Sequence, residues 1–170
     1  KNWPKTYYAR GFVYQKIYES DKQEFKNLTE DPLFNSFESY KKAYEMDEEE
    51  NYKGSIDAAM FILHKYFIND GVEAFQNKNY DQAFNNFKYA LKVADMPVFK
   101  NRIDTAIMFN AGIAAQNMKD WSKAAKYYSM AAEYGYGGAR TYLLLKNAYF
   151  QASDTANAVQ TLKEGFEKYP

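Results

Sequence analysis

Apolar side chains recur along this chain in pairs of helical stretches, and a short polar turn separates the two stretches of each pair. The clearest copies of the pattern cover residues 67–90 and 108–131, and a looser copy covers residues 142–165. Within each stretch the apolar residues follow one another at steps of three and four, which indicates an amphipathic helix. The pattern therefore predicts antiparallel helix pairs. The three polar turns are residues 77–79, 119–120 and 153–154.

Small residues occupy matching positions in these copies. Gly71 and Ala83 of the first copy correspond to Gly112 and Ala124 of the second, and in both copies the glycine precedes the alanine by 12 residues. Ala158 is the matching alanine of the third copy, so successive alanines are 41 and 34 residues apart. Because two helices approach closely only where side chains are small, we expect Gly112 to face the region of Ala124. We expect large side chains to fill the remaining space: Tyr80, Phe87, Trp121, Tyr128 and Leu162.

A fourth copy begins near the N-terminus, and it carries an insertion. Gly11 occupies the small position of the first stretch, while Ser36, Tyr40 and Ala43 follow the pattern of the second. The step from Gly11 to Ser36 is 25 residues instead of 12, so 13 extra residues intervene. They fall in the polar residues 19–32, which we expect to lengthen the first helix and then form a surface loop.

Three further segments connect the expected helices. The 41-residue step exceeds 34 by seven, about two helical turns, so we expect residues 98–104 to lengthen a helix without rotating its apolar face. The acidic residues 47–50 close a second helix and are expected to form a solvated turn. The glycine-rich residues 135–138 lack the spacing of a phosphate-binding loop and are expected to form a turn between repeats.

A repeat of about 34 residues with these small and aromatic positions resembles the tetratricopeptide repeat (TPR) family. The resemblance implies an all-α fold, a right-handed superhelical stack of antiparallel helix pairs in a single domain over residues 1–170. About four repeats and eight helices are expected, with an insertion in the first repeat. The expected repeats are residues 4–50, 54–97, 100–136 and 138–170.

Composition excludes several classes of function. The 22 Lys and Arg residues balance 22 Asp and Glu residues, so no basic face for nucleic-acid binding is expected. No apolar stretch approaches the roughly 18 residues that span a membrane, so this segment is not expected to insert into one. The chain has no cysteine, and hence neither disulfides nor thiolate zinc sites. Because it begins at Lys1, we expect a processed form or an excised segment, which leaves both an exported and a cytoplasmic location open.

The sequence offers little for catalysis. His64 is the only histidine, and neither a cysteine nor a glycine-flanked serine accompanies it. It lies in a helical stretch, where we expect partial burial against a neighbouring helix. We therefore predict no catalytic residue, no metal site and no cofactor, and a protein that is not an enzyme.

The resemblance implies a binding surface instead. In TPR proteins the first helix of each pair lines a concave groove that holds a peptide or a partner protein, and this is the function that we predict. The carboxylate clamp of some TPR domains is not expected, because Ile68 and Val72 stand where Lys and Asn would be needed. Counting from the small residue of each first helix gives the predicted groove: Tyr8, Phe12, Gln15, Lys65, Ile68, Asn69, Val72, Phe75, Phe109, Asn110, Ile113, Asn117, Arg140, Leu143, Asn147 and Phe150.

Two alternatives remain open. Aromatic residues make up 19% of the chain, and a cluster of exposed rings would favour binding of a glycan or another small ligand. The last helix carries Val159, Phe166 and Tyr169 beyond the residues that its own partner helix would bury. A self-assembling repeat, in which the last helix associates end to end with another copy, is therefore the second alternative.

Overall fold

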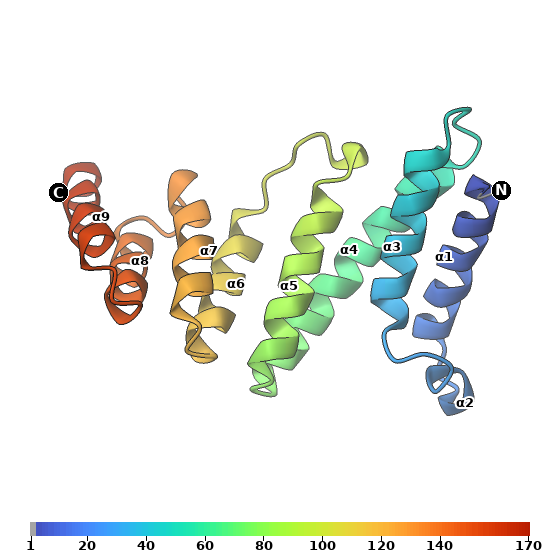
Figure 1. The fold of residues 1–170 in the computed structure, drawn as a ribbon, viewed down its shortest axis with the longest axis horizontal. Coiled ribbons are helices and arrows are strands. Elements are labelled where there is room, and N and C mark those ends of the chain that lie inside the picture. The colour runs from blue at the N-terminus through green and yellow to red at the C-terminus, as the bar shows by residue number, and fades with distance from the viewer. Residues whose placement is uncertain (1–2) are drawn as a thin grey trace.

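Antiparallel helix pairs follow one another along the molecule, and the two termini lie at opposite ends of the array (Figure 1). The structure is a computed structural model that describes residues 3–170, and within this range it contains helices and no strand. The stack of helix pairs expected from the sequence is confirmed. The pairs are α1 (Pro4–Glu19) with α3 (Pro32–Met46), α4 (Lys53–Gln76) with α5 (Tyr80–Ala94), α6 (Thr105–Asn117) with α7 (Trp121–Glu133), and α8 (Ala139–Gln151) with α9 (Thr155–Lys168).

A glycine on the first helix and an aromatic ring on the second set the separation within three of the pairs. A Cβ atom added to any of these glycines would lie 2.7 Å from a carbon of the facing ring, closer than packed atoms approach. The ring that faces Gly112 belongs to Tyr128, one turn beyond the expected contact at Ala124. The three contacts are Gly11 with Tyr40, Gly71 with Phe87 and Gly112 with Tyr128.

The fourth pair makes the same kind of contact with the roles exchanged. Lys146 occupies the first-helix position that glycine holds in the other pairs, and the glycine is Gly165 on α9. A Cβ atom on Gly165 would lie 3.0 Å from the Cβ of Tyr142 on α8. Close approach is therefore kept even where the sequence pattern is loosest.

The three polar turns share one geometry. The residue before each N-cap has a positive φ, for example 61° at Lys119. The backbone N–H of the next residue, Asp120, donates back to the carbonyl of Ala115 at 3.0 Å, which closes the preceding helix. The Asp120 carboxylate then accepts from the N–H of Lys123 at 3.1 Å and begins the next helix. Asn79 and Asp154 act in the same way, so the turns predicted from the sequence are confirmed.

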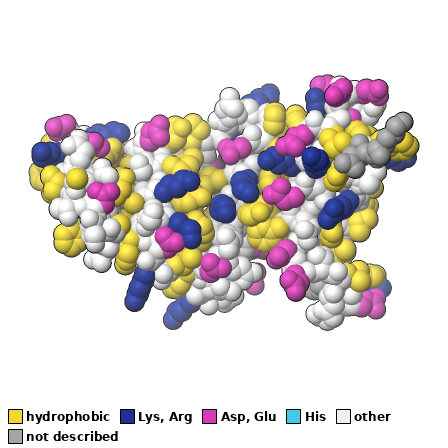
Figure 2. Space-filling view, viewed as in Figure 1, with side chains coloured by type: hydrophobic (Ala, Val, Ile, Leu, Met, Phe, Trp, Pro, Cys, Tyr) yellow, Lys and Arg dark blue, Asp and Glu magenta, His cyan; other side chains and the backbone are white. Residues whose placement is uncertain are grey.

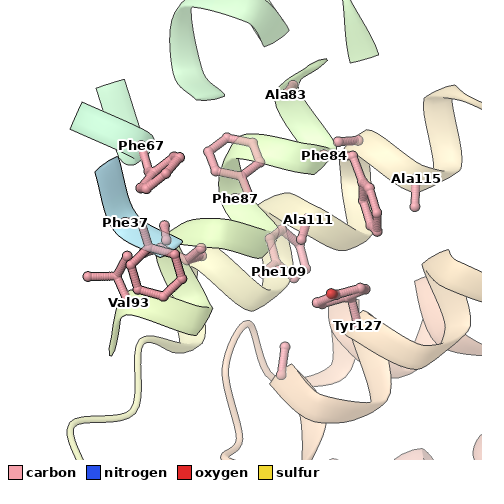
Figure 3. Close-up of a cluster of buried hydrophobic side chains, with 14 of the residues drawn as sticks. Phe37, Phe67, Ala83, Phe84, Phe87, Val93, Phe109, Ala111, Ala115 and Tyr127 are labelled. Carbon is pink, nitrogen blue, oxygen red and sulfur yellow. The ribbon is translucent and has the colours of Figure 1, made fainter. Parts of the chain in front are cut away.

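Aromatic rings connect the first pair to the second and the second pair to the third. Phe84 on α5 and Tyr127 on α7 meet edge to face with their centroids 5.3 Å apart (Figure 3). Phe37 on α3 meets Phe67 on α4 in the same manner at 6.4 Å. The buried side chains thus form one continuous core along the stack.

The prediction for residues 98–104 is wrong. They form a short 3₁₀ turn, Pro97–Phe99, followed by an irregular segment in which Lys100 and Asn101 have positive φ. Pro97 cannot continue α5, because proline lacks the N–H that a helix interior needs. The long helix is α4, whose 24 residues extend at its N-terminus, and Phe99 packs on this extension at 4.9 Å from Phe61.

The insertion after α1 was expected to lengthen this helix and then form a surface loop, and only part of this expectation is met. α1 ends at Glu19, eight residues beyond Gly11, whereas α6 ends five residues beyond Gly112, so the expected lengthening is present. The rest contains a short helix, α2 (Gln23–Lys26), beside the end of α1 (Figure 1).

Asp47 was expected in a solvated turn, and this expectation is wrong. Its side chain is buried, and its carboxylate accepts hydrogen bonds from three successive backbone N–H groups at the start of α4. The bonds from Tyr52 and Lys53 measure 2.6 and 3.0 Å. A carboxylate stabilises a helix N-terminus because the first N–H groups have no partner within the helix. Asp47 therefore fixes the junction between α3 and α4.

Gly112→Ala tests the close contact within a pair. We expect the free energy of unfolding to fall by about 1–3 kcal/mol, because the Tyr128 ring is buried and cannot move away. The matched control is Gly54→Ala on α4, where nothing lies within 4 Å of the added Cβ. The control should be neutral or stabilising by up to about 1 kcal/mol, since alanine favours a helix. Urea denaturation of both variants measures the difference, and equal stabilities would contradict the role given to the contact.

Candidate functional site

The first helices of the second and third pairs enclose a hollow with a volume of about 240 Å³. Four residues predicted for the groove lie together here: Val72 and Phe75 on α4, and Asn110 and Ile113 on α6. Gln76 of α4 and Phe87 of α5 complete the lining. We call this hollow and its six lining residues the α4–α6 groove.

The lining of the α4–α6 groove is apolar, with amides as its polar groups. Val72 leaves 40% of its surface exposed, whereas Phe87 is buried at the base of the hollow. Gln76 and Asn110 supply amides, which both donate and accept hydrogen bonds. No charged side chain lines the groove. Its chemistry suits an apolar side chain whose flanking backbone pairs with amides.

Other predicted residues of α4 and α6 lie outside the hollow. Lys65 and Asn69 are exposed on α4, and the half-buried Ile68 packs against the core. The Asn117 amide donates to the carbonyl of Ile113 within its own helix at 2.8 Å. These residues lie around the α4–α6 groove without lining it.

Phe109 is a core residue, and the prediction that it lines the groove is wrong. Only 8% of its surface is exposed, and its ring packs against Tyr128 at 5.7 Å and Tyr136 at 5.4 Å. The guanidinium of Arg140 lies 5.9 Å from the ring centroid, so Arg140, itself exposed, covers Phe109. Phe109 lies one turn before Ile113, about 40° around the helix at 100° per residue, so the two positions share a face, and the burial of Phe109 comes from the cover that Tyr136 and Arg140 provide.

The predicted residues of the first repeat are dispersed. Gln15 is buried and accepts a hydrogen bond from the Tyr40 hydroxyl at 3.0 Å, so it does not line a groove. Tyr8 is half-buried and stacks on Tyr52 at 5.1 Å. Phe12 is exposed and lines a separate hollow of about 350 Å³ between α1 and α2. The sequence did not indicate α2, so it could not predict this hollow.

The predicted residues of the fourth repeat are exposed on α8 and do not reach the α4–α6 groove. Arg140 and Asn147 are exposed, as are the apolar Leu143 and Phe150. Leu143 lines a third hollow, of about 190 Å³, which α8 and α9 form at the end of the array. The structure therefore brings together four of the predicted residues, all of them from the second and third repeats.

The sequence missed two of the six groove residues. Phe87 was expected as a core filler, and its ring also forms the base of the hollow. Gln76 lies one turn beyond Val72 on the same helix. Counting one turn further along α4 would have found Gln76.

A polar network joins the first two repeats beside a hollow of about 430 Å³. The Tyr18 hydroxyl donates to Asp70 at 2.7 Å, and the Tyr66 hydroxyl donates to Glu19 at 3.1 Å. Burial raises the pKa of Asp70, and the hydrogen bond from Tyr18 offsets only part of this effect. Since both bonds run between α1 and α4, they fix how these two first helices lie relative to each other.

His64 is partly buried, as the sequence predicts. Its ring packs 5.0 Å from Phe99, and its Nε2 atom is buried without a hydrogen-bond partner. Burial lowers the pKa of His64, and the positive charge of Arg102 adds to this, while Asp104 opposes it. The residue therefore belongs to the contact between α4 and the irregular segment that follows α5.

Neither charge nor metal-binding residues mark a second site in the part of the chain that the structure describes. Lys and Arg side chains alternate with Asp and Glu over the face shown in Figure 2. Among residues 3–170, no group of three or more His, Asp or Glu side chains could hold a metal ion. None of the described helices is both long and apolar enough to cross a membrane.

Exposed aromatic side chains lie on several different elements. Phe12 belongs to α1, Phe61 to α4 and Phe166 to α9, so they lie on different repeats. Binding of a glycan by stacking needs rings gathered on one surface. This distribution does not favour the glycan-binding alternative.

The structure is similar to a TPR repeats protein from Bacteroides fragilis. The match has a TM-score of 0.55 and 29% sequence identity, and it covers 63% of this chain and 45% of that chain. The match therefore spans less than half of the Bacteroides protein. The fold of this chain is a TPR-like helical repeat. No protein-family model matches the chain, and no curated protein matches it either.

The partly buried imidazole of His64 should make this TPR-like protein less stable in mild acid. The pKa of His64 in the folded chain lies below its ordinary value of 6.5, so the unfolded chain binds the proton more readily. The free energy of unfolding should therefore fall as the pH drops below 6.5 toward the folded pKa. Denaturation at several pH values between about 7.5 and 5.5 measures this slope. His64→Gln should flatten it, and an unchanged slope would assign the effect to other groups.

Proposed function

We propose that this protein is a non-enzymatic interaction scaffold that holds a peptide segment of a protein partner in the α4–α6 groove. The observation that carries the proposal is the hollow of about 240 Å³ between the first helices of two repeats. A TPR-like repeat is a kind of fold that serves protein interaction. The groove lies on the helices that the TPR resemblance assigns to binding.

The lining of the groove defines the chemistry of the peptide. Val72, Phe75 and Ile113 offer apolar contacts around the buried ring of Phe87. One large apolar side chain of the peptide fills this space and gains by leaving water. The amides of Gln76 and Asn110 bond the peptide backbone beside that side chain.

Charge plays a small part in this recognition. No Lys or Arg lines the groove, and Ile68 and Val72 stand where a carboxylate clamp would need Lys and Asn. The peptide is therefore held through an internal apolar residue rather than through its terminal carboxylate. Its affinity should change little with salt, because screening weakens charge pairs and leaves apolar contacts intact.

Two exposed valines provide a matched test of the groove. Val72→Glu places a carboxylate in the hollow, whereas Val159→Glu makes the same change on α9, where Val159 is similarly exposed. Peptides are first selected on the wild-type chain from a displayed random library, and their affinities for the three proteins are then measured by fluorescence polarisation. We expect Val72→Glu to weaken binding about tenfold or more, since a buried unpaired charge costs more than about 1.4 kcal/mol.

The selected peptides should share a large apolar residue, and Val159→Glu should bind them as the wild type does. Circular dichroism spectra confirm that both variants are folded. Peptides that bind Val72→Glu and the wild type equally well would show that the groove is not their site.

A further inference from the structure

The hollow of about 430 Å³ beside Tyr18 and Asp70 lies on the other side of α4 from the α4–α6 groove, and its lining is polar. It opens where α1 meets α4 and the start of α5. We call it the Asp70 hollow. Its polar lining consists of Tyr18 of α1, Asp70 and Glu73 of α4, Asn77 directly after α4, and Asn79 and Gln82 at the start of α5.

The negative charge of the Asp70 hollow is not neutralised by the described part of the chain. The half-buried Asp70 accepts the hydrogen bond of the Tyr18 hydroxyl through Oδ1, and this neutral partner leaves the charge of the carboxylate in place. Glu73, one turn further along α4, brings a second carboxylate to the same hollow. No described Lys or Arg side chain forms an ion pair with either residue. Burial raises the pKa of Asp70, and the nearby Glu73 raises it further.

The amides of the Asp70 hollow differ in their engagement. The Asn79 Nδ2 atom donates to the Oε1 atom of Gln82 at 2.8 Å, so these two side chains bond to each other at the N-cap of α5. Asn77 is exposed at the rim, and its side-chain oxygen can accept a hydrogen bond. The hollow therefore presents mainly acceptors: two carboxylates and an amide. A positively charged group with several N–H donors complements them.

The two hollows flank the same part of α4. The Tyr18 hydroxyl of α1 meets Asp70 on one side of α4, whereas Asn110 of α6 lines the groove on the other side. α1 and α6 accordingly lie on either side of α4 along the array (Figure 1). Gln76 of the groove, Glu73 and Asp70 follow one another at steps of three residues, so they form a row around the helix from one hollow to the other.

A single extended peptide is long enough to occupy both hollows. A helix with its side chains is about 10–12 Å across, and each residue of an extended chain advances about 3.3 Å. A peptide residue about three positions from the apolar residue in the α4–α6 groove therefore reaches the Asp70 hollow. The row between the hollows leaves room for such a peptide, because Gln76 and Glu73 are both exposed.

We propose that the Asp70 hollow binds a lysine or arginine side chain of the peptide that occupies the α4–α6 groove, about three positions from its apolar residue. The inference rests on the proposed function and adds a charge requirement to the apolar one. The cationic group lies between the second oxygen of Asp70 and the carboxylate of Glu73. The Tyr18 hydroxyl holds Asp70 in place for this contact.

Salt separates the two contacts of the peptide. The apolar contact in the α4–α6 groove changes little with salt, so a peptide without a basic residue keeps its affinity. The ion pair in the Asp70 hollow weakens as salt screens it, although partial burial makes this screening less complete than at an exposed pair. A salt-dependent part of the affinity therefore belongs to the basic residue.

Selection from the displayed random library on matched variants tests the inference. One variant combines Asp70→Asn with Glu73→Gln, and the asparagine can still accept the Tyr18 hydrogen bond. The control combines Glu164→Gln with Glu167→Gln, which removes two exposed carboxylates at the same spacing from α9. Wild type and control should both select Lys or Arg about three positions from a large apolar residue. The Asp70 and Glu73 variant should lose the basic preference and keep the apolar one.

Affinities of one selected peptide and of its version with glutamine for the basic residue give the size of the effect. At low salt we expect the glutamine to weaken binding to the wild type about tenfold, the scale of a hydrogen bond to a charged group. On the Asp70 and Glu73 variant it should change binding less than about twofold. Glu73→Gln alone, at an exposed position that does not threaten the fold, should give an intermediate loss.

Selected peptides with the apolar residue but without a basic one would overturn this inference and leave groove binding intact. So would a glutamine substitution that weakens binding equally to the wild type and to the Asp70 and Glu73 variant. Peptides with neither preference, or peptides that bind Val72→Glu as they bind the wild type, would overturn the proposed function and this inference with it.

Discussion

The close contact between a glycine and an aromatic ring determines how the helix pairs of this protein are built. In three pairs a ring on the second helix occupies the space where the Cβ of the facing residue would lie. The two helices can then approach until the ring packs on the backbone. In the last pair Gly165 and Tyr142 reverse the arrangement, so the requirement is for one small and one large residue, whichever helix supplies each.

The same contact between glycine and ring also shapes the α4–α6 groove. The ring of Phe87 packs against Gly71 within the second pair, and the same ring forms the base of the α4–α6 groove. The residues that follow the two glycines, Val72 and Ile113, line the hollow beside this ring, Val72 exposed and Ile113 half-buried. The contact that fixes the second pair is thus also part of the hollow where we propose that a peptide binds. On α9 the same repeat leaves Val159, Leu162 and Phe166 exposed, whereas the equivalent positions on α5 and α7 are buried or half-buried.

The sequence predicts the parts of the fold that depend on local spacing. The helix pairs, the polar turns and four groove residues follow from counting along a helix. It could not place Phe109 correctly, because the burial of that ring depends on Tyr136 and Arg140 from the next repeat. Nor could it show that Asp47 is buried, since its partners are backbone N–H groups that become available only when α4 begins at that turn. The spacing of apolar and polar residues along the chain therefore does not predict contacts between repeats or contacts to the backbone.

Methyl NMR spectra of the chain, recorded with and without a selected peptide, test the central claim most directly. Val72 and Ile113 line the α4–α6 groove, while Val159 is exposed on α9 and Val93 is buried in α5. Binding in the groove should shift the methyl signals of Val72 and Ile113 and leave those of Val159 and Val93 in place. Shifts at Val159 without shifts at Val72 and Ile113 would contradict the account, because the peptide would then bind at the end of the array.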